Sequence, residues 1–307
     1  MAAPARLARL AGRRPSSGGI ARESLRYFIY VVRSSPLSII GVAIVASVLL
    51  LTLISPWIVP YDPENASTGE TLQAPSGKHL LGTDSSGLDI LSRLLTATRT
   101  DIPVAILATL SAMVIGVGLG VVAGYFGNRR GLKGMPGEIL LRVMDVLQAF
   151  PVFILAMALV AATGPSPLNV GIAVTFVNAP IFLRLIRQQV LGLREMSYVE
   201  AARCAGAKPL RIAFVNILPG VVSPALIQGS VTVGFAILLT AGLSFVGAGV
   251  PAPTPEWGLM IANGSHDIQT GQWWTSVFPG LALAVTVLGF ALTGEAVGRA
   301  LDPLQRR

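Results

Sequence analysis

Long stretches without a charged residue constrain this chain more than any other feature of its sequence. No charge occurs between Leu37 and Val59, and none occurs between Ile212 and Pro255. A helix needs about 20 apolar residues to cross the hydrocarbon core of a bilayer, so each stretch is long enough to do so. Only 12% of the 307 residues are charged, whereas a soluble domain carries about 25%. The sequence therefore predicts a protein built from membrane-spanning helices.

Six spans can be placed on the sequence, and they predict an all-α membrane protein. Their approximate bounds are 37–59, 102–126, 139–163, 168–186, 219–246 and 276–297. Of the 23 Lys and Arg residues, only Lys78, Arg93 and Arg99 fall in a segment assigned to the outer side. Basic residues concentrate in the cytoplasmic segments of membrane proteins. The arrangement therefore predicts six transmembrane helices with the N and C termini both in the cytoplasm.

Composition divides the chain into three parts. Residues 1–35 are rich in Arg and predict a basic cytoplasmic tail, close to anionic lipid, with a short amphipathic helix before the first span. Residues 36–101 comprise the first span and an extracytoplasmic loop, in which the leucines between Ser85 and Thr98 indicate a helix on the outer surface. Residues 102–307 are expected to form a core of five spans.

A stripe of glycines marks the second span. Gly116, Gly120 and Gly124 recur every four residues and share one helix face. Small residues in such a stripe let the backbones of two membrane helices approach closely. We therefore expect this face to pack on a neighbouring helix rather than on lipid.

A short charged island separates the fourth and fifth spans. Ser197 and Glu200 have the spacing of a capping box, in which each side chain binds a free backbone N–H at the start of a helix. Gly206 can take the left-handed conformation that ends a helix, and Pro209 suits the first turn of the next one. The pattern predicts a short helix, a tight turn and a second helix that leads into the span at Pro219.

One face of this short helix is predicted to be shallow. Tyr198, Ala201, Ala202 and Ala205 recur at helical spacing, and three of the four are alanines. Such a face allows another protein to approach closely. Cys204, the single cysteine, is expected to be a small packing residue on the same helix.

Three parts of this region resemble the EAA loop in the permease subunits of bacterial ABC importers: Glu200-Ala201-Ala202, then Gly206, then Ile217-Leu218-Pro219. In that family the loop forms a coupling helix that docks into a cleft on an ATPase subunit. The resemblance implies such a cytoplasmic coupling loop at about 194–219. The residues that it assigns to ATPase coupling are Tyr198, Glu200, Ala201, Ala202, Arg203, Gly206, Ala207, Leu218 and Pro219.

Further motifs resemble the peptide and nickel transporter branch of that family, and within it the second permease subunit, the DppC/OppC type. They are Leu81-Gly82-Thr83-Asp84, Asp89-Ile90-Leu91-Ser92-Arg93, Met144-Asp145-Val146-Leu147, Ala149-Phe150-Pro151, Gly242-Leu243-Ser244-Phe245-Val246-Gly247, Pro253-Thr254-Pro255-Glu256-Trp257-Gly258 and Arg299-Ala300-Leu301-Asp302-Pro303. The resemblance covers most of the chain. It implies a fold like that of type I ABC importers, located in the inner, or plasma, membrane.

The resemblance also implies a set of partners. A homologous second permease subunit, two ATPase subunits and an extracytoplasmic solute-binding protein would complete the transporter, with membrane lipid around it. ATP and Mg²⁺ would bind in the ATPase subunits, and this chain would hold no cofactor. Its expected role is to form half of the translocation path for di- or oligopeptides, while nickel and glutathione stay open as alternative cargo.

The residues of the chain also argue against other classes of protein. No stretch has the spacing of a Walker A loop, and no H-E-x-x-H or nucleophile–base set is present, so this chain is not expected to be an enzyme. The two histidines, His79 and His266, are far apart in the sequence, and the chain has only one cysteine. No metal site is therefore expected. Most basic residues border spans, and no nucleic-acid reader motif occurs, so nucleic acid is not an expected partner. A stand-alone channel or secondary transporter remains the alternative class, which the lack of charges in the middle of the spans disfavours.

Each of the polar residues in the spans has two alternative interpretations. Asn178, Gln228 and Thr232 either line a translocation path or form hydrogen bonds between helices. Arg142 and Asp145 either form an i,i+3 ion pair near the membrane interface or belong to a gate or substrate contact.

Two further acidic residues lie near the ends of spans. Glu295 is expected to pair with Arg299 one helical turn later. Glu256 lies in an outer loop, where it either stabilises the fold of the loop or contacts the binding protein.

Overall fold

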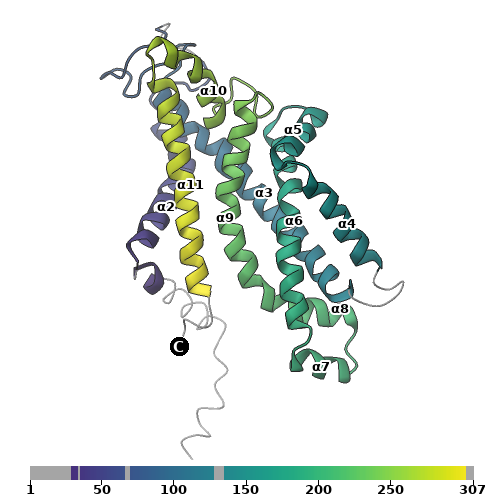
Figure 1. Cartoon of the computed structure of the whole chain (residues 1–307). Coiled ribbons are helices and arrows are strands. Elements are labelled where there is room, and N and C mark those ends of the chain that lie inside the picture. The colour runs from purple at the N-terminus through teal and green to yellow at the C-terminus, as the bar shows by residue number, and fades with distance from the viewer. Residues whose placement is uncertain (1–28, 34, 66–69, 128–134, 302–307) are drawn as a thin grey trace, which may run out of the picture.

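The computed structural model describes residues 29–33, 35–65, 70–127 and 135–301, so most of the predicted basic tail lies outside the described residues. The described chain is helical almost throughout (Figure 1). Its long helices are α2 (Pro36–Ile58), α3 (Ile90–Phe126), α4 (Met135–Ala149), α5 (Val152–Thr163), α6 (Pro167–Leu193), α9 (Leu218–Phe245) and α11 (Trp274–Leu301). Its shorter ones are α7 (Ser197–Cys204), α8 (Pro209–Arg211), the π-helix η1 (Ile212–Ile217), α10 (Trp257–Asp267) and the 3-10 helix η2 (Ile268–Thr270).

Among the described residues, five helices are each long and apolar enough to cross a bilayer, and α4 with α5 supplies a sixth crossing when the pair counts as one broken span. The all-α fold with its membrane spans is therefore confirmed. The third predicted span is not a straight helix, because the chain bends by 95° between α4 and α5. Pro151 accounts for the break, since its ring disfavours helical geometry at Phe150 and it has no N–H to donate.

α3 replaces two of the predicted elements. The surface helix expected between Ser85 and Thr98 begins only at Ile90, and it continues into the span expected at 102–126 as one helix. Its 37 residues extend about 55 Å, well beyond the roughly 30 Å of a hydrocarbon core. The extra length lies toward the outer loop, and there it carries Arg93 and Asp101, whose side chains are buried.

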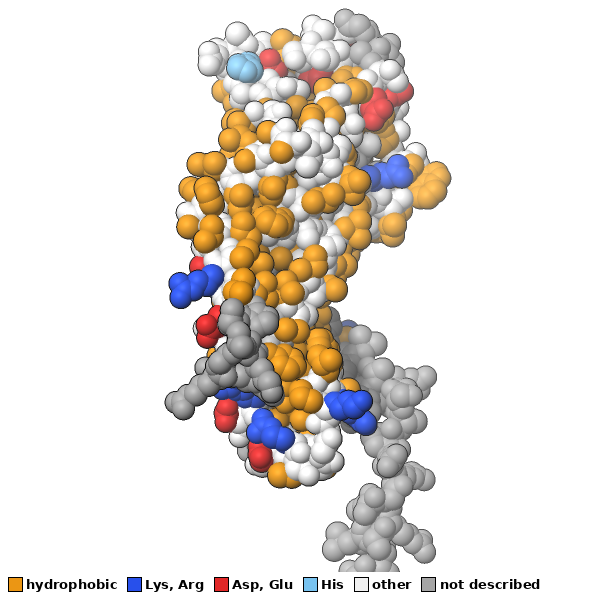
Figure 2. Space-filling model, turned by 90° about the vertical axis from the view of Figure 1, so that its right-hand side faces the viewer, with side chains coloured by type: hydrophobic (Ala, Val, Ile, Leu, Met, Phe, Trp, Pro, Cys, Tyr) orange, Lys and Arg blue, Asp and Glu red, His pale blue; other side chains and the backbone are white. Residues whose placement is uncertain are grey.

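α3 also crosses the molecule diagonally and organises the bundle (Figure 1). It packs most extensively on α6 and also on α9 and α2, while α11 packs on α9, α2 and α10. α4 and α5 lie at the edge of the bundle beside α6, on the side away from α11 (Figure 1). Figure 2 shows that hydrophobic side chains cover most of the middle of the face on that side.

The glycine stripe of α3 is where α6 approaches most closely, which confirms the predicted packing. A Cβ atom on Gly116 would lie 2.5 Å from the Cβ of Phe182. On Gly120 it would lie 2.8 Å from the carbonyl oxygen of Leu183, and on Gly124 it would lie 2.7 Å from the Cβ of Val190. No real Cβ atom tolerates these separations, so only glycine permits the observed contact between the two helices.

We expect Gly120→Ala to lower the thermal stability of the detergent-purified protein. The added methyl group must push α3 away from α6, and such overpacking costs about 1–3 kcal/mol. Gly118→Ala is the matched control, because a Cβ there meets nothing within 4 Å. Thermal unfolding followed by tryptophan fluorescence measures both variants, and equal midpoints would contradict the packing argument.

The outer end of α3 is fixed by buried polar contacts. Asp89 caps the helix by accepting a hydrogen bond from the backbone N–H of Ser92 at 2.8 Å. Its other oxygen lies 2.9 Å from Nδ1 of His79, and both side chains are buried. His79 therefore has a role in folding the outer loop onto α3.

Glu256, a buried acidic residue, fixes the start of α10 through polar contacts. Its carboxylate caps that helix by accepting a hydrogen bond from the backbone N–H of Leu259 at 2.6 Å. The backbone N–H of Trp257 donates to Asp101 on α3 at 3.1 Å, and the two carboxyl groups interact with each other. Glu256 is fully buried, so it folds the loop and is not exposed to a binding protein. Burial raises the pKa of the Glu256 carboxyl above its usual range.

This raised pKa predicts a pH-dependent effect of Glu256→Gln. A carboxyl whose folded-state pKa is raised stabilises the fold below its unfolded pKa and loses that contribution as pH rises through the folded value. Gln keeps a capping oxygen and stays neutral, so the variant should match the parent at acidic pH and exceed its unfolding temperature at alkaline pH. Glu256→Ala removes the cap and should be less stable at every pH, by about 1 kcal/mol. A constant difference between the Gln variant and the parent across pH would contradict this account.

Candidate functional site

The charged island forms a compact element beyond the ends of the long helices. α7 follows α6 after a short connection, α8 and η1 follow α7, and η1 leads directly into α9. α7 lies at one end of the molecule, away from α10 (Figure 1). The predicted order of short helix, turn and second helix is confirmed.

The predicted capping box is wrong. α7 begins one residue earlier than expected, with Met196 as its N-cap and no side chain bound to the free N–H groups. Ser197 is then already inside the helix, and Glu200 is too far along to reach back. Glu200 instead accepts a hydrogen bond from Arg203 at 2.6 Å, and both side chains are about half exposed. An exposed pair of this kind adds little to stability.

The predicted turn at Gly206 is confirmed. Gly206 has φ +76°, its N–H donates to the carbonyl of Arg203, and the N–H of Ala207 donates to the carbonyl of Ala202. These two bonds form a Schellman motif, which satisfies the last carbonyl groups of α7. Pro209 then occupies the first turn of α8.

The shallow face differs from its prediction at one position. Tyr198, Ala201 and Ala205 are exposed and form an outward face, with the Tyr198 side chain 45% exposed. Ala202 is half-buried and packs inward, as Ala207 does. Cys204 is exposed rather than packed, so the expectation for it was wrong. We call Tyr198, Ala201 and Ala205 the outward face of α7.

A hydrophobic cluster fixes α7 to the long helices. Val199 is fully buried and belongs to one cluster with residues of α3, α6, η1 and α9. The members of that cluster are Val121, Tyr125, Ile186, Val190, Val199, Ile212, Ala213, Ile217, Val221 and Ala225. The sequence reasoning missed Val199, although an apolar residue opposite the alanines of a charged helix is a usable signal for such an anchor.

The junction between η1 and α9 is a π-turn. The N–H of Leu218 donates to the carbonyl of Ala213, five residues back, instead of four. Pro219 follows, and because it has no N–H it cannot continue a regular helical ladder. The half-buried Leu218 packs on the cluster around Val199, so the turn is held in place from the inside.

The predicted polar residues of the spans have different environments. Asn178 and Thr232 are buried inside this chain, and Gln228 is half-buried. Nε2 of Gln228 donates to Oγ1 of Thr232 at 3.2 Å, within α9. The path-lining role stays a prediction for all three, and two of them are enclosed in this arrangement.

The expected pair of Arg142 with Asp145 is wrong. Asp145 Oδ1 accepts from Nη2 of Arg184 at 2.6 Å, which joins α4 to α6 instead. Spacing along one helix cannot reveal a partner on another helix, so sequence patterns gave no signal for this contact. The expected pair of Glu295 with Arg299 is confirmed at 3.6 Å.

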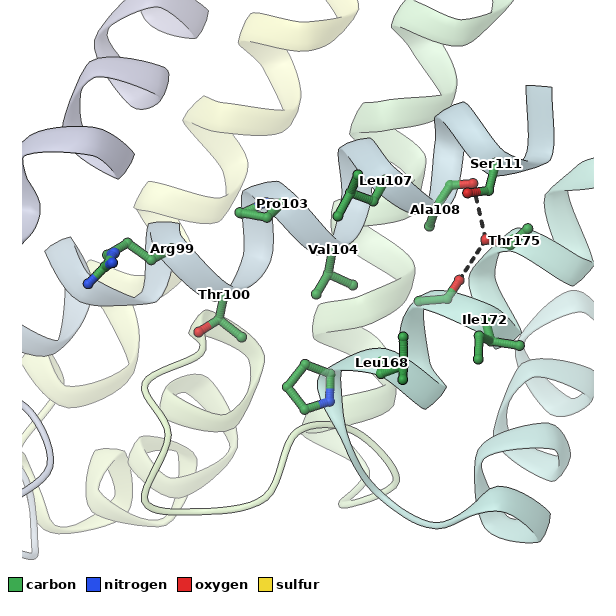
Figure 3. Close-up of a pocket in the computed structure, with 12 residues that line it drawn as sticks. Arg99, Thr100, Pro103, Val104, Leu107, Ala108, Ser111, Leu168, Ile172 and Thr175 are labelled. Carbon is green, nitrogen blue, oxygen red and sulfur yellow. Dashed lines mark hydrogen bonds between the residues drawn. The ribbon is translucent and has the colours of Figure 1, made fainter. Parts of the chain in front are cut away.

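A hollow lies between α3 and α6 (Figure 3). Its lining is mainly apolar and includes Val104, Leu107 and Ile172, with Arg99 at one end. Oγ1 of Thr175 donates to the carbonyl of Ala108 at 3.2 Å and bridges the two helices there. With so few polar groups converging on it, this hollow has no constellation for catalysis.

Nothing in the described residues gathers three or more His, Cys, Asp or Glu side chains in a way that could hold a metal ion. The arrangement therefore offers a mechanical capability. An exposed short helix packs on η1, and its buried Val199 belongs to a hydrophobic cluster that η1 shares with α3, α6 and α9, so a force on its outward face is passed to the bundle through this cluster.

We expect Gly206→Ala to loosen the end of α7. An alanine at a left-handed position costs about 1–2 kcal/mol, while space is not limiting because a Cβ there meets nothing within 4 Å. Gly192→Ala is the control, since it is equally open but lies inside α6 with ordinary helical geometry. Hydrogen–deuterium exchange should rise over residues 201–211 only in the Gly206 variant, and unchanged exchange would contradict the role of the turn.

Two protein-family models match this chain. Residues 116–307 match the family described as binding-protein-dependent transport system inner membrane component. Residues 25–75 match the N-terminal transmembrane domain of oligopeptide transport permease C.

Individual relatives align with nearly the whole chain. The dipeptide transport system permease protein DppC of Alkalihalophilus pseudofirmus is 38% identical over 272 residues, which is 89% of this chain and 87% of the relative. The probable D,D-dipeptide transport system permease protein DdpC of Escherichia coli is 36% identical, over 90% of each chain. The glutathione transport system permease protein GsiD of Pectobacterium atrosepticum is 41% identical, over 86% of this chain and 87% of the relative.

Proposed function

Because the chain belongs to the family of binding-protein-dependent transport system inner membrane components, we propose that it forms half of the translocation path for di- or oligopeptides in an ATP-driven importer. It is a multi-pass membrane protein of this family, with the helical spans described above. The peptide cargo follows from the relatives named as dipeptide permeases, which align with about nine-tenths of the chain.

The observation that carries the proposal is the mounting of α7. Its outward face is small and exposed, while Val199 on the opposite side is fully buried in a cluster shared with α3, α6, η1 and α9. In our proposal an ATPase subunit binds the outward face together with Glu200 and Arg203. ATP-driven movement of that subunit then displaces α7, and the buried contacts transmit the displacement to the spans. A change of state requires such differential contacts in the two states.

The remaining parts of the transporter are proposed on the same basis. A homologous second permease subunit completes the path, two ATPase subunits bind ATP and Mg²⁺ and hydrolyse the nucleotide, and an extracytoplasmic binding protein delivers the solute. We place α7 and both termini on the cytoplasmic side. The basic residues around α7, such as Arg194, Lys208 and Arg211, support this orientation through the positive-inside rule.

The proposed organisation keeps the three parts deduced from composition. Residues 1–35 are a basic cytoplasmic tail, 36–101 hold the first span with its outer loop, and 102–307 form the core with the coupling loop at about 194–219. Glutathione is the second candidate cargo, because one relative is named as a glutathione permease.

Purification of the tagged protein from its native membrane in mild detergent tests the proposal. A second permease and one or two ATPase subunits should copurify. Recovery of a well-folded homo-oligomer without an ATPase would instead favour a stand-alone channel or carrier.

We expect Ala201→Trp to abolish copurification of the ATPase subunits. The large side chain would stand on the outward face of α7 and block close approach, while the fold is spared because Ala201 is exposed. Ala74→Trp is the matched control, since Ala74 is equally exposed but lies on the outer loop at the other end of the molecule. Full recovery of ATPase with the Ala201 variant would show that the docking surface is elsewhere.

A further inference from the structure

An ion pair joins α4 to α6 on the open surface of the described chain. Nη2 of Arg184 lies 2.6 Å from Oδ1 of Asp145, and the side chains are 48% and 64% exposed. Arg184 belongs to a helix that qualifies as a span, and Asp145 belongs to the bent pair that qualifies as one. Two charges are therefore exposed within segments that cross the membrane.

The surface of α4 around Asp145 is apolar. Val143, Val146 and Phe150 are 48%, 62% and 53% exposed, on both sides of Asp145 along the helix. A charge at the centre of a bilayer costs about 2.5–3.5 kcal/mol even on insertion scales, so charged residues in spans face protein or a water-filled cavity. The described residues leave the pair uncovered, and we infer that the surface that carries it faces away from lipid in the assembled transporter.

Polar residues continue from the pair along both helices. On α4, Glu138, Arg142 and Asp145 are spaced i, i+4 and i+7, so they share one face, and all three are exposed. On α6, Gln188 follows Arg184 by one turn and is exposed as well. We call these five residues the polar stripe. A stripe on two neighbouring helices is the pattern expected beside water.

The polar stripe extends in one direction only. From the ion pair it runs toward the N-terminus of α4 and the C-terminus of α6, the end of the bundle that carries α7 (Figure 1). In the other direction the exposed residues are apolar: Phe150, Val152 and Ile154 on the α4–α5 side and Phe176 on α6. The ion pair thus stands where the polar surface ends.

α4 has few contacts with its neighbouring helices. It packs on α3 and α6 much less extensively than α3, α6 and α9 pack on one another. The hydrogen bond between Asp145 and Arg184 is therefore one of the few contacts that join α4 to its neighbours.

We propose that the polar stripe lines the water-filled half of the translocation path on the α7 side, and that the Asp145–Arg184 pair closes this half by holding α4 against α6. The inference rests on the proposed function, since it takes the path to lie between this chain and a second permease. α6 continues for nine residues, about 14 Å, from Arg184 to its end at Leu193, and α7 follows. A displacement of α7 therefore reaches the ion pair through one rigid helix.

Thiol labelling tests the water-filled surface. In the complete transporter, Cys204 is first replaced by Ser, and Gln188→Cys or the control Leu53→Cys is added. Leu53 is an exposed apolar residue of α2 with no charged neighbour in its span. A charged, membrane-impermeant methanethiosulfonate reagent, applied to inside-out vesicles, should label position 188 at least tenfold faster than position 53. Equal, slow labelling would overturn the proposal.

Charge variants test the closing role. Asp145→Asn and Arg184→Gln should each lower ATP-dependent uptake of a labelled dipeptide at least fivefold while the ATPase subunits still copurify. Combining Asp145→Arg with Arg184→Asp restores the pair in reverse and should recover at least half of the lost uptake. Normal uptake by the single variants, or a reversed pair no better than they are, would overturn the closing role.

The two levels of inference fail in different ways. If the parent with Cys204→Ser recovers no ATPase subunit and shows no uptake, the proposed function fails. If the parent transports but position 188 is not labelled, only the polar stripe inference fails. The labelling experiment with Gln188→Cys leaves the ion pair unchanged. It therefore tests whether the polar stripe faces water even where a charge variant does not assemble.

Discussion

The close contact between α3 and α6 is the constraint on which the rest of the structure depends. Gly116, Gly120 and Gly124 let α6 lie against the backbone of α3 from the middle of the bundle to the end that carries α7. α6 in turn holds Arg184, which binds α4, and continues into α7. A frame of two closely packed helices thus connects α7, the proposed docking element, with the helices beside the proposed path.

Buried apolar contacts hold α7 on the bundle, whereas Ala201 and Ala205 are exposed and belong to the face that we propose binds a partner. Val199 is buried in a hydrophobic cluster whose other members come from α3, α6, η1 and α9, so α7 cannot leave the bundle without exposing Val199 to water. The Schellman turn at Gly206 and the π-turn before Pro219 fix the course of the chain from α7 to α9. A short helix mounted in this way can transmit force, because little of a displacement is lost in flexible links.

The end of the molecule that carries α10 is held together differently (Figure 1). Asp89 binds His79 and caps α3, and Glu256 caps α10 next to Asp101. Buried polar groups require partners, so these contacts fix the geometry of the outer loops more specifically than apolar packing does. The two ends of the bundle therefore differ in chemistry as well as in position.

Local sequence patterns were enough to predict the apolar spans, the glycine contact face, and the helix, turn and proline of the segment at 194–219. Each of these depends on properties of neighbouring residues: hydrophobic length, small size at regular spacing, and the conformational freedom of Gly206. Three features depend on contacts between parts of the chain that are far apart in the sequence. They are the N-cap of α7 at Met196, the burial of Val199, and the pairing of Asp145 with Arg184 instead of Arg142. A local pattern fixes which side chains share a helix face, but which other helix meets that face depends on how the whole bundle packs.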